Sequence, residues 1–214
     1  MTESATGLIL RTRPLTETSL IVHWLTPDAG RIATVAKGAR RPKSPFSGKL
    51  DLFYLADFSF IRSRRSDLHT LGEVSLQNTH GEIRQDMHRL HQAAYAAAFV
   101  EQATETDTPL PGIFELVASF LGCLCRHTFA PQIILAFELK FLRELGLKPD
   151  LEETKLTPGT KQIVRALTRD DWPSCLRLKL AKSQADELQH FLHTFLLFHL
   201  DRLPMGRAAA LAED

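Results

Sequence analysis

SLIVHWLTPDAGRIATVAK, residues 19–37, is the stretch that decides the fold. Its first eight residues are rich in β-branched, aliphatic and aromatic side chains, and its last seven alternate along the chain, as strands do. The four residues Pro27–Gly30 between them form a turn in which Gly30 can take a positive φ. The stretch therefore predicts a β-hairpin.

Three further strands are predicted on either side of this hairpin. They are Gly7–Arg13, which stops at Pro14, then Phe53–Ile61 and Leu68–Leu76. Five short strands, with one longer connection between the third and the fourth, are typical of the OB-fold. An SH3-like barrel is the main alternative.

From Glu82 onward the apolar residues recur every three or four positions, which predicts helices. The expected helices are Ile83–Ala103, Thr108–Cys125, Ala130–Leu145, Thr157–Leu167 and a last one that opens with Ser183 and Asp186 as a capping box and runs to Leu200. Gly146 is expected at a left-handed helix terminus, and the tail Met205–Asp214 is expected to fray.

Charge divides the chain near residue 80. Residues 1–80 carry a formal charge of +4 and residues 81–214 carry −3, although the whole chain is only +1. We therefore expect an α+β protein with two domains. A five-stranded OB-fold barrel would occupy residues 1–80 and bind nucleic acid, and an all-α domain would occupy residues 81–214.

A dense basic stretch lies in the first half of the chain. Residues 31–65 hold nine Lys or Arg and two acidic residues, a local charge of +7. The nine candidate DNA-binding residues are Arg31, Lys37, Arg40, Arg41, Lys43, Lys49, Arg62, Arg64 and Arg65. They fall mainly on the loop after the third strand and on the next hairpin tip, so two basic edges are expected to flank one groove of the barrel.

Aromatic residues share this window: Phe46, Phe53, Tyr54, Phe58 and Phe60. Cations that meet phosphates and rings that stack on bases together form a platform for single-stranded nucleic acid. The alternative is that the basic loop is simply solvated and that the rings, which alternate in a strand, are core.

Catalytic motifs are absent from the sequence. We find no nucleophile elbow, no HExxH pair and no phosphate-binding P-loop, and the nine histidines are scattered. We therefore expect a protein that is not an enzyme and that needs no cofactor or metal. Three cysteines, no signal peptide and an apolar run at Phe191–Leu200 of about half a membrane span predict a cytoplasmic protein with reduced thiols.

Several segments, in order, resemble the bacterial RecO recombination-repair mediators. They are Leu10–Arg13 (LRTR), Glu17–Val22 (ETSLIV), Ala36–Ser44 (AKGARRPKS), Leu68–Glu73 (LHTLGE), Phe137–Leu142 (FELKFL) and Pro149–Leu151 (PDL). The run Lys37-Gly38-Ala39-Arg40-Arg41 is the most specific part. Members of this family commonly carry a four-cysteine zinc site after the segment corresponding to Pro149–Leu151. Here only Cys175 follows, and one thiol cannot form such a site, so the chain resembles a short, zinc-free form.

The resemblance implies a mediator that binds single- and double-stranded DNA, anneals complementary strands and helps load RecA. It implies two protein partners, RecR and the acidic tail of the single-strand-binding protein, and a bacterial, nucleoid-associated location. Lys140 and Arg143 are the candidates for binding that tail, because its terminal carboxylate needs a cation beside an apolar pocket. Two other hypotheses remain: an OB-type RNA-binding protein, and a scaffold whose basic loop docks an acidic protein surface.

Overall fold

The computed structural model describes residues 2–127 and 130–212. The chain forms two compact units, one of Met1–Gly81 with Ala103–Leu121 and one of Glu82–Gln102 with Gly122–Asp214. The expected boundary at residue 80 remains a prediction, although the segment 103–121 groups with the strands. None of the described helices has both the length and the apolar character needed to span a bilayer.

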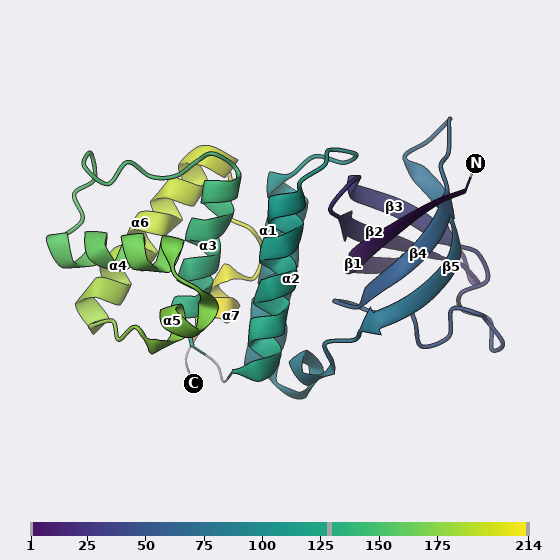
Figure 1. Cartoon of the computed structure of the whole chain (residues 1–214), viewed down its shortest axis with the longest axis horizontal. Coiled ribbons are helices and arrows are strands. Elements are labelled where there is room, and N and C mark those ends of the chain that lie inside the picture. The colour runs from purple at the N-terminus through teal and green to yellow at the C-terminus, as the bar shows by residue number, and fades with distance from the viewer. Residues whose placement is uncertain (1, 128–129, 213–214) are drawn as a thin grey trace. The chain divides into compact units, whose positions relative to one another are not determined.

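The first unit contains a closed barrel of five strands (Figure 1). The strands are β1 (Thr2–Pro14), β2 (Leu20–Thr26), β3 (Gly30–Ala36), β4 (Leu55–Ile61) and β5 (Leu68–Asn78). Their order around the barrel is β1-β2-β3-β5-β4, with β3 and β5 parallel and the other pairs antiparallel. This arrangement confirms the predicted OB-fold.

Strand β1 closes the barrel because it pairs with two neighbours. Its first part pairs with β4, from Thr2 opposite Ile61 to Leu8 opposite Leu55. Its second part, from Leu8 to Pro14, pairs with β2, with an irregularity in the register between Ile9 and Arg11. Gly7 lies just before the change of partner, and a Cβ there would come within 3.0 Å of the Phe58 ring. A larger residue at this position would therefore crowd the core.

Aromatic side chains fill the barrel core. The rings of Trp24 and Phe58 stack with their centroids 4.0 Å apart. The Trp24 indole Nε1 donates a 2.8 Å hydrogen bond to the Thr34 hydroxyl, so the buried indole N–H has an acceptor. The turn between β2 and β3 is as predicted, with Gly30 at a φ of 64°.

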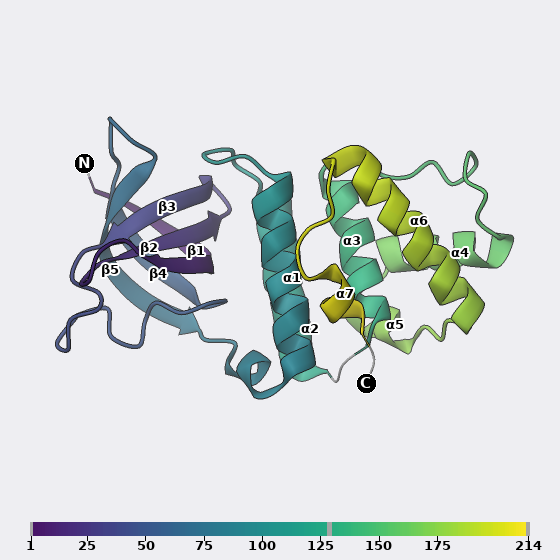
Figure 2. The same ribbon diagram turned by 180° about the vertical axis from the view of Figure 1, so that it is seen from behind.

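The remaining elements are helical (Figure 2). They are the short 3-10 helix η1 (Gly81–Gln85) and the α-helices α1 (Met87–Ala103), α2 (Pro111–Arg126), α3 (Gln132–Glu144), α4 (Pro158–Arg169), α5 (Trp172–Arg177), α6 (Lys182–Leu200) and α7 (Arg207–Leu211). Of the seven α-helices in the part of the chain that the structure describes, five correspond to predicted ones. Helices α5 and α7 were not expected from the sequence.

Two helix ends are formed as predicted. The Thr157 side chain accepts from the Thr160 N–H at the start of α4, and Gly146, just beyond the end of α3, has a φ of 75°. The predicted capping box of Ser183 and Asp186 is wrong. Helix α6 begins one residue earlier, and the Gln184 side chain accepts from the Ala181 N–H at 3.0 Å instead.

Helix α3 is the centre of the second unit, and every residue from Ile133 to Leu142 is buried. Within this run Glu138 is fully buried and accepts two bonds from Arg207, at 2.6 Å and 2.9 Å. The Tyr95 hydroxyl also donates to it. Because Arg207 opens α7, this buried pair fixes the end of the chain to α3. The predicted fraying of the tail is therefore wrong for residues 205–212; residues 213–214 lie outside the described ones.

Removing Arg207 should destabilise the protein strongly. Arg207→Ala leaves the Glu138 carboxylate buried without its cation, which we expect to lower the free energy of unfolding by about 3–5 kcal/mol. Urea denaturation monitored by circular dichroism measures this change. The control is Arg202→Ala, at an exposed position on the preceding loop, with an effect within about 0.5 kcal/mol.

A second variant identifies the cause. Tyr95→Phe/Glu138→Met/Arg207→Met removes the whole polar cluster, and we expect it to recover most of the lost stability, because no charge is then left unpaired. Equal losses in the single and the triple variant would contradict this explanation.

Candidate nucleic-acid interface

The register of four strands builds two rows of side chains across the outside of the barrel. Residues paired across neighbouring strands share a face, and successive residues along a strand alternate between faces. Because Val22, Trp24 and Ile32 point into the core, the residues that alternate with them point outward. We call these two rows the outer face. The rows are Arg11–His23–Ala33–Leu68 and Arg13–Ile21–Val35–Thr70.

His23 reports a positive field on this outer face. Burial first, and then the neighbouring cations Arg13, Arg11 and Arg31 in that order, lower the pKa of His23 to about 4. Its buried Nε2 makes no hydrogen bond within the described part of the chain. The imidazole is therefore neutral at pH 7 among three arginines.

Arg11 and Arg13 were missed by the sequence analysis, which confined the basic cluster to residues 31–65. Both are exposed on β1. The available signal was the alternation at the end of β1, together with pairing to β2, which places them beside His23. Charge density counted along the chain cannot reveal cations that a neighbouring strand brings together.

The loop between β3 and β4 is ordered by a succession of turns. Backbone bonds link Arg41 to Gly38, Ser44 to Arg41, and Lys49 to Phe46. The Phe46 ring is buried against the barrel core. Because the loop is held in one conformation, less ordering is needed when it binds a ligand.

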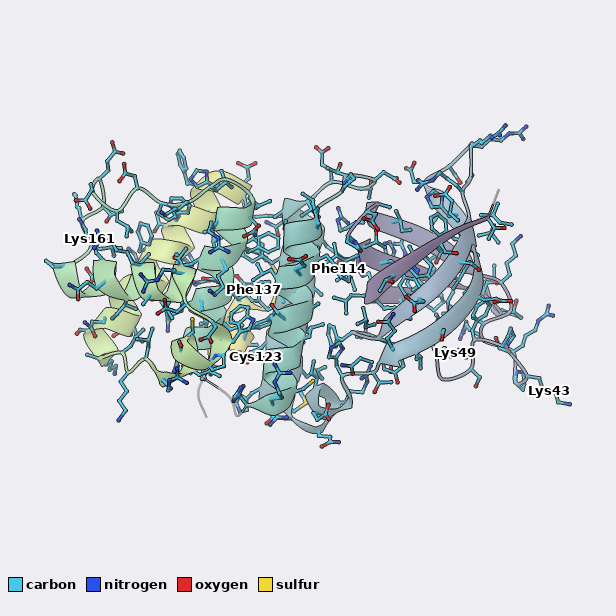
Figure 3. The ribbon with its side chains drawn as sticks, in the orientation of Figure 1. Lys43, Lys49, Phe114, Cys123, Phe137 and Lys161 are labelled. Carbon is cyan, nitrogen blue, oxygen red and sulfur yellow. The ribbon has the colours of Figure 1, made fainter. Side chains whose placement is uncertain are left out.

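This loop is also attached to the loop between β1 and β2. The Arg40 N–H donates to the Thr18 carbonyl at 3.0 Å, and its guanidinium donates to the Thr16 carbonyl at 3.1 Å. Lys37, Arg41 and Lys43 are exposed, and Lys43 projects from the loop into solvent (Figure 3).

Besides Arg40, three other predicted DNA-binding cations have side chains that are bonded within the described part of the protein. The Lys49 ammonium donates to the Val74 carbonyl on β5 at 3.1 Å. The Arg31 guanidinium donates to the Thr104 hydroxyl at 2.8 Å and to the Thr104 carbonyl. The Arg62 guanidinium bonds to carboxylates, as described below. Their assignment as DNA contacts stays a prediction, but their positions favour a structural role.

The hairpin between β4 and β5, residues 62–67, carries the other basic edge. Arg64 and Arg65 are exposed at its tip. Leu68, where β5 begins, lies opposite Ala33 on β3, and the β3–β4 loop leaves from Ala36. The bases of the two loops are thus three residues, or about 10 Å, apart along β3.

The proposed base-stacking rings are not on this surface. Phe46, Phe53, Phe58 and Phe60 are buried, and Tyr54 is half-buried against the core. The prediction of an aromatic stacking platform is therefore wrong for these five residues, and the alternative, that they form the core, is confirmed. Rings that alternate with polar residues along a strand point inward together.

The two candidate partner-binding residues lie on α3, and their side chains donate to carbonyls at the end of α4. The Lys140 side chain is buried and donates to the Thr168 carbonyl at 3.3 Å and to the Asp170 carbonyl. Arg143 donates to the Thr168 carbonyl at 2.9 Å. Burial lowers the pKa of Lys140. The Lys140 ammonium thus satisfies the last carbonyls of α4. Its assignment to the tail stays a prediction, which its burial disfavours.

Arg143 also lines a pocket of about 700 Å³ in the second unit. Its other lining residues are Lys148, Pro149, Asp150, Leu151, Glu152, Val164, Arg165, Thr168 and Arg169. The pocket thus combines four cations with two carboxylates and an apolar part. Arg165 pairs with Glu152 at 3.0 Å, and both side chains are more than half exposed, so this pair can open at little cost.

Among the described residues, no three His, Cys, Asp or Glu side chains are grouped as a metal site would require. The three cysteines are free thiols, two buried and one half-buried. Burial raises the pKa of both Cys123 and Cys125 to about 11, which disfavours the reactive thiolate.

His23 should make stability depend on pH. Its pKa is about 4 in the folded protein and near 6.5 when unfolded, so between these values the unfolded chain binds more protons. Stability contributed at this site is therefore lost as the pH falls from 6.5 to 4. We expect His23→Gln to lose less stability than the wild type between pH 7 and pH 4.5 in urea denaturation. Identical losses in the two proteins would contradict the assigned environment of His23.

Comparison with known proteins identifies relatives for both parts of the chain. Residues 1–80 match the family model described as Recombination protein O N terminal, and residues 84–154 match Recombination protein O C terminal. A protein named DNA repair protein RecO from Rhodopirellula baltica is 36% identical over 143 residues, which cover 67% of this chain and 53% of that protein. One of the same name from Bacillus subtilis is 34% identical over 145 residues, covering 68% of this chain and 56% of that protein.

The similarity extends along nearly the whole chain in another relative. DNA repair protein RecO from Alkaliphilus metalliredigens is 34% identical over 231 residues, covering 92% of this chain and 93% of that protein. The match spans only about half the length of the Rhodopirellula and Bacillus proteins. With two family models in order and a relative matched almost end to end, the chain belongs to the RecO family.

Proposed function

We propose that this protein is a non-catalytic mediator of DNA repair and recombination that binds single- and double-stranded DNA through the outer face of its barrel. The observation that supports this most is the group of exposed cations around that face. They are Arg11 and Arg13 on β1, Lys37, Arg40, Arg41 and Lys43 on the β3–β4 loop, and Arg64 and Arg65 on the β4–β5 hairpin. Family membership supports the same role.

Binding of this kind would be independent of base sequence. Cations hold phosphates and position a strand without reading its bases. The five candidate stacking rings are in the barrel core or half-buried against it, so in our proposal the bases of a bound strand stay accessible. One positive surface that screens two strands while leaving their base edges available would promote annealing of complementary DNA.

The basic loop can be tested directly. Arg40→Ala/Arg41→Ala/Lys43→Ala should weaken binding to fluorescent single-stranded DNA. Affinity falls as salt rises, and each lost phosphate contact makes the slope of log affinity against log salt shallower by about 0.7. Losing three contacts therefore makes it shallower by about 2. Fluorescence anisotropy at several salt concentrations measures both quantities. Equal affinity and slope in the two proteins would remove the loop from the proposed site.

A matched control removes the same number of charges from the second unit. Lys155→Ala/Lys161→Ala/Lys182→Ala removes three cations from the second unit, and we expect the wild-type slope. The two alternatives have distinct outcomes. Tighter binding to RNA of the same sequence without annealing of DNA would favour an RNA-binding protein, and no binding to either at low salt would favour a protein scaffold.

We further propose that the acidic, phenylalanine-ending tail of the single-strand-binding protein docks in the pocket lined by Arg143. The apolar side chains of Leu151 and Val164 suit the terminal ring, and the surrounding cations suit its carboxylates. Lys140 is not part of this proposal, because its ammonium is bonded to the end of α4. RecR is a further proposed partner, and loading of RecA the proposed outcome, both from family membership.

Charge reversal tests the tail site. Arg165→Glu/Arg169→Glu should weaken binding of a fluorescent tail peptide by about tenfold or more, since each charge-assisted hydrogen bond contributes about 1.5–3 kcal/mol. The control is Arg177→Glu/Lys179→Glu, which lie on a second pocket of about 770 Å³ and should change the affinity less than about twofold. Loss of binding only in the control variant would instead place the tail in that second pocket.

A further inference from the structure

We infer that Arg62 is a positioning residue, which holds the basic tip of the β4–β5 hairpin, and not a residue that contacts phosphate. This inference rests on the proposed function, because it assigns the tip residues Arg64 and Arg65 to DNA. It also reassigns a residue that the sequence placed among the DNA contacts.

Arg62 bridges two carboxylates from distant parts of the first unit. Its Nε and Nη2 donate to the two Glu3 oxygens at 3.1 Å and 3.2 Å, and its Nη1 donates to Asp107 Oδ1 at 2.8 Å. Hydrogen bonds to Glu3 and then to Asp107 raise the pKa of Arg62. The guanidinium also lies 5.5 Å from the centroid of the Phe60 ring. Its planar fork is therefore occupied on two sides.

Both carboxylates are on rigid supports. Glu3 lies opposite Phe60 where β1 pairs with β4. Asp107 is held beside β3. Its N–H donates to the Arg31 carbonyl at 2.9 Å, and the preceding residue, Thr106, forms a parallel bridge with Arg31. The Arg31 side chain fixes the same segment through Thr104. Arg62 thus joins the base of the hairpin to two fixed points.

The hairpin beyond Arg62 continues from this anchored base. The Ser63 N–H donates to Nδ1 of His69, a buried residue stacked on Phe60. The Ser63 hydroxyl then accepts from the Arg65 N–H at 3.2 Å. A chain of bonds therefore leads from the anchored base to the exposed tip and restrains the backbone that carries the two tip cations.

Charge balance argues against a phosphate at Arg62. One guanidinium with two carboxylates carries a net charge of −1. A phosphate drawn to this place would meet two acidic groups at close range, and moving Arg62 away to meet it would leave both carboxylates without their cation. The tip cations Arg64 and Arg65 follow in the chain and are exposed, and among the described residues no ion pair with an acidic residue involves them.

A substitution that keeps the charge tests the inference. Arg62→Lys retains a cation but loses the fork that bonds both carboxylates. We expect faster amide hydrogen exchange at residues 62–68 and between about threefold and tenfold weaker binding to an oligothymidine, with an unchanged salt slope, because tip cations must then be ordered on binding. The matched control is Arg64→Lys/Arg65→Lys, which should leave the exchange and the affinity near wild type.

Unchanged exchange in Arg62→Lys would overturn the inference, and so would faster exchange with unchanged affinity. A second variant is Arg62→Gln. If its salt slope were shallower than that of the wild type by about 0.7, the value expected of one direct phosphate contact, the inference would be overturned. Failure of the wild type to bind DNA at low salt would refute the proposed function instead. The exchange measurement would still decide whether Arg62 holds the hairpin.

Discussion

The pairing of β1 with both β4 and β2 is the constraint on which the first unit depends. A sheet of five strands that did not close would leave two edges with unpaired backbone groups. The change of partner after Gly7 lets one strand pair with both neighbours. The core residues Trp24 and Phe58 lie inside the resulting barrel. Closure also sets the register across β1, β2, β3 and β5, and that register brings Arg11 and Arg13 beside His23 on the outer face.

The cations of this protein divide into two groups that local charge does not distinguish. Arg31, Lys49 and Lys140 bond to backbone carbonyls, and Arg62 and Arg207 bond to carboxylates. Each of these holds one segment of the chain against another. The second group, on the β1 end, the β3–β4 loop and the β4–β5 tip, is exposed, and within it Arg40 also donates to the Thr16 carbonyl. Part of the +7 charge of residues 31–65 therefore belongs to cations that are bonded inside the protein, so fewer positive charges are available to a bound phosphate than the sequence suggests.

Local signals predicted much of the fold. Alternation and β-branched or aromatic content located the five strands, although β1 begins at Thr2 and was expected from Gly7. The turn at Gly30 was correct, and Thr157 and Gly146 marked helix ends where the structure has them. These features depend on residues close in sequence, so one chain is enough to see them. Helix α5 was missed although Asp171 caps it with a 2.9 Å bond from the Ser174 N–H, because six residues are too few to show a helical period.

Long-range contacts were the source of the errors. The tail looked frayed because the partner of Arg207 is Glu138, 69 residues earlier. Lys140 became a candidate for binding a partner because the carbonyls that accept from it belong to a different helix and could not be foreseen. The missed residues Arg11 and Arg13 became part of the candidate site only through strand pairing. Side-chain type predicted what each residue can do, whereas the partner available to it required the tertiary structure.

The order of strands has a consequence for synthesis on the ribosome. Because β1 needs β4 and β3 needs β5, residues made first must wait until residues 55–70 have been translated before the barrel can close. At typical rates of about 5–20 residues per second, this wait lasts several seconds. During it the nascent chain exposes apolar strands with open edges, so early folding of this protein is a stage at which a chaperone would be of use.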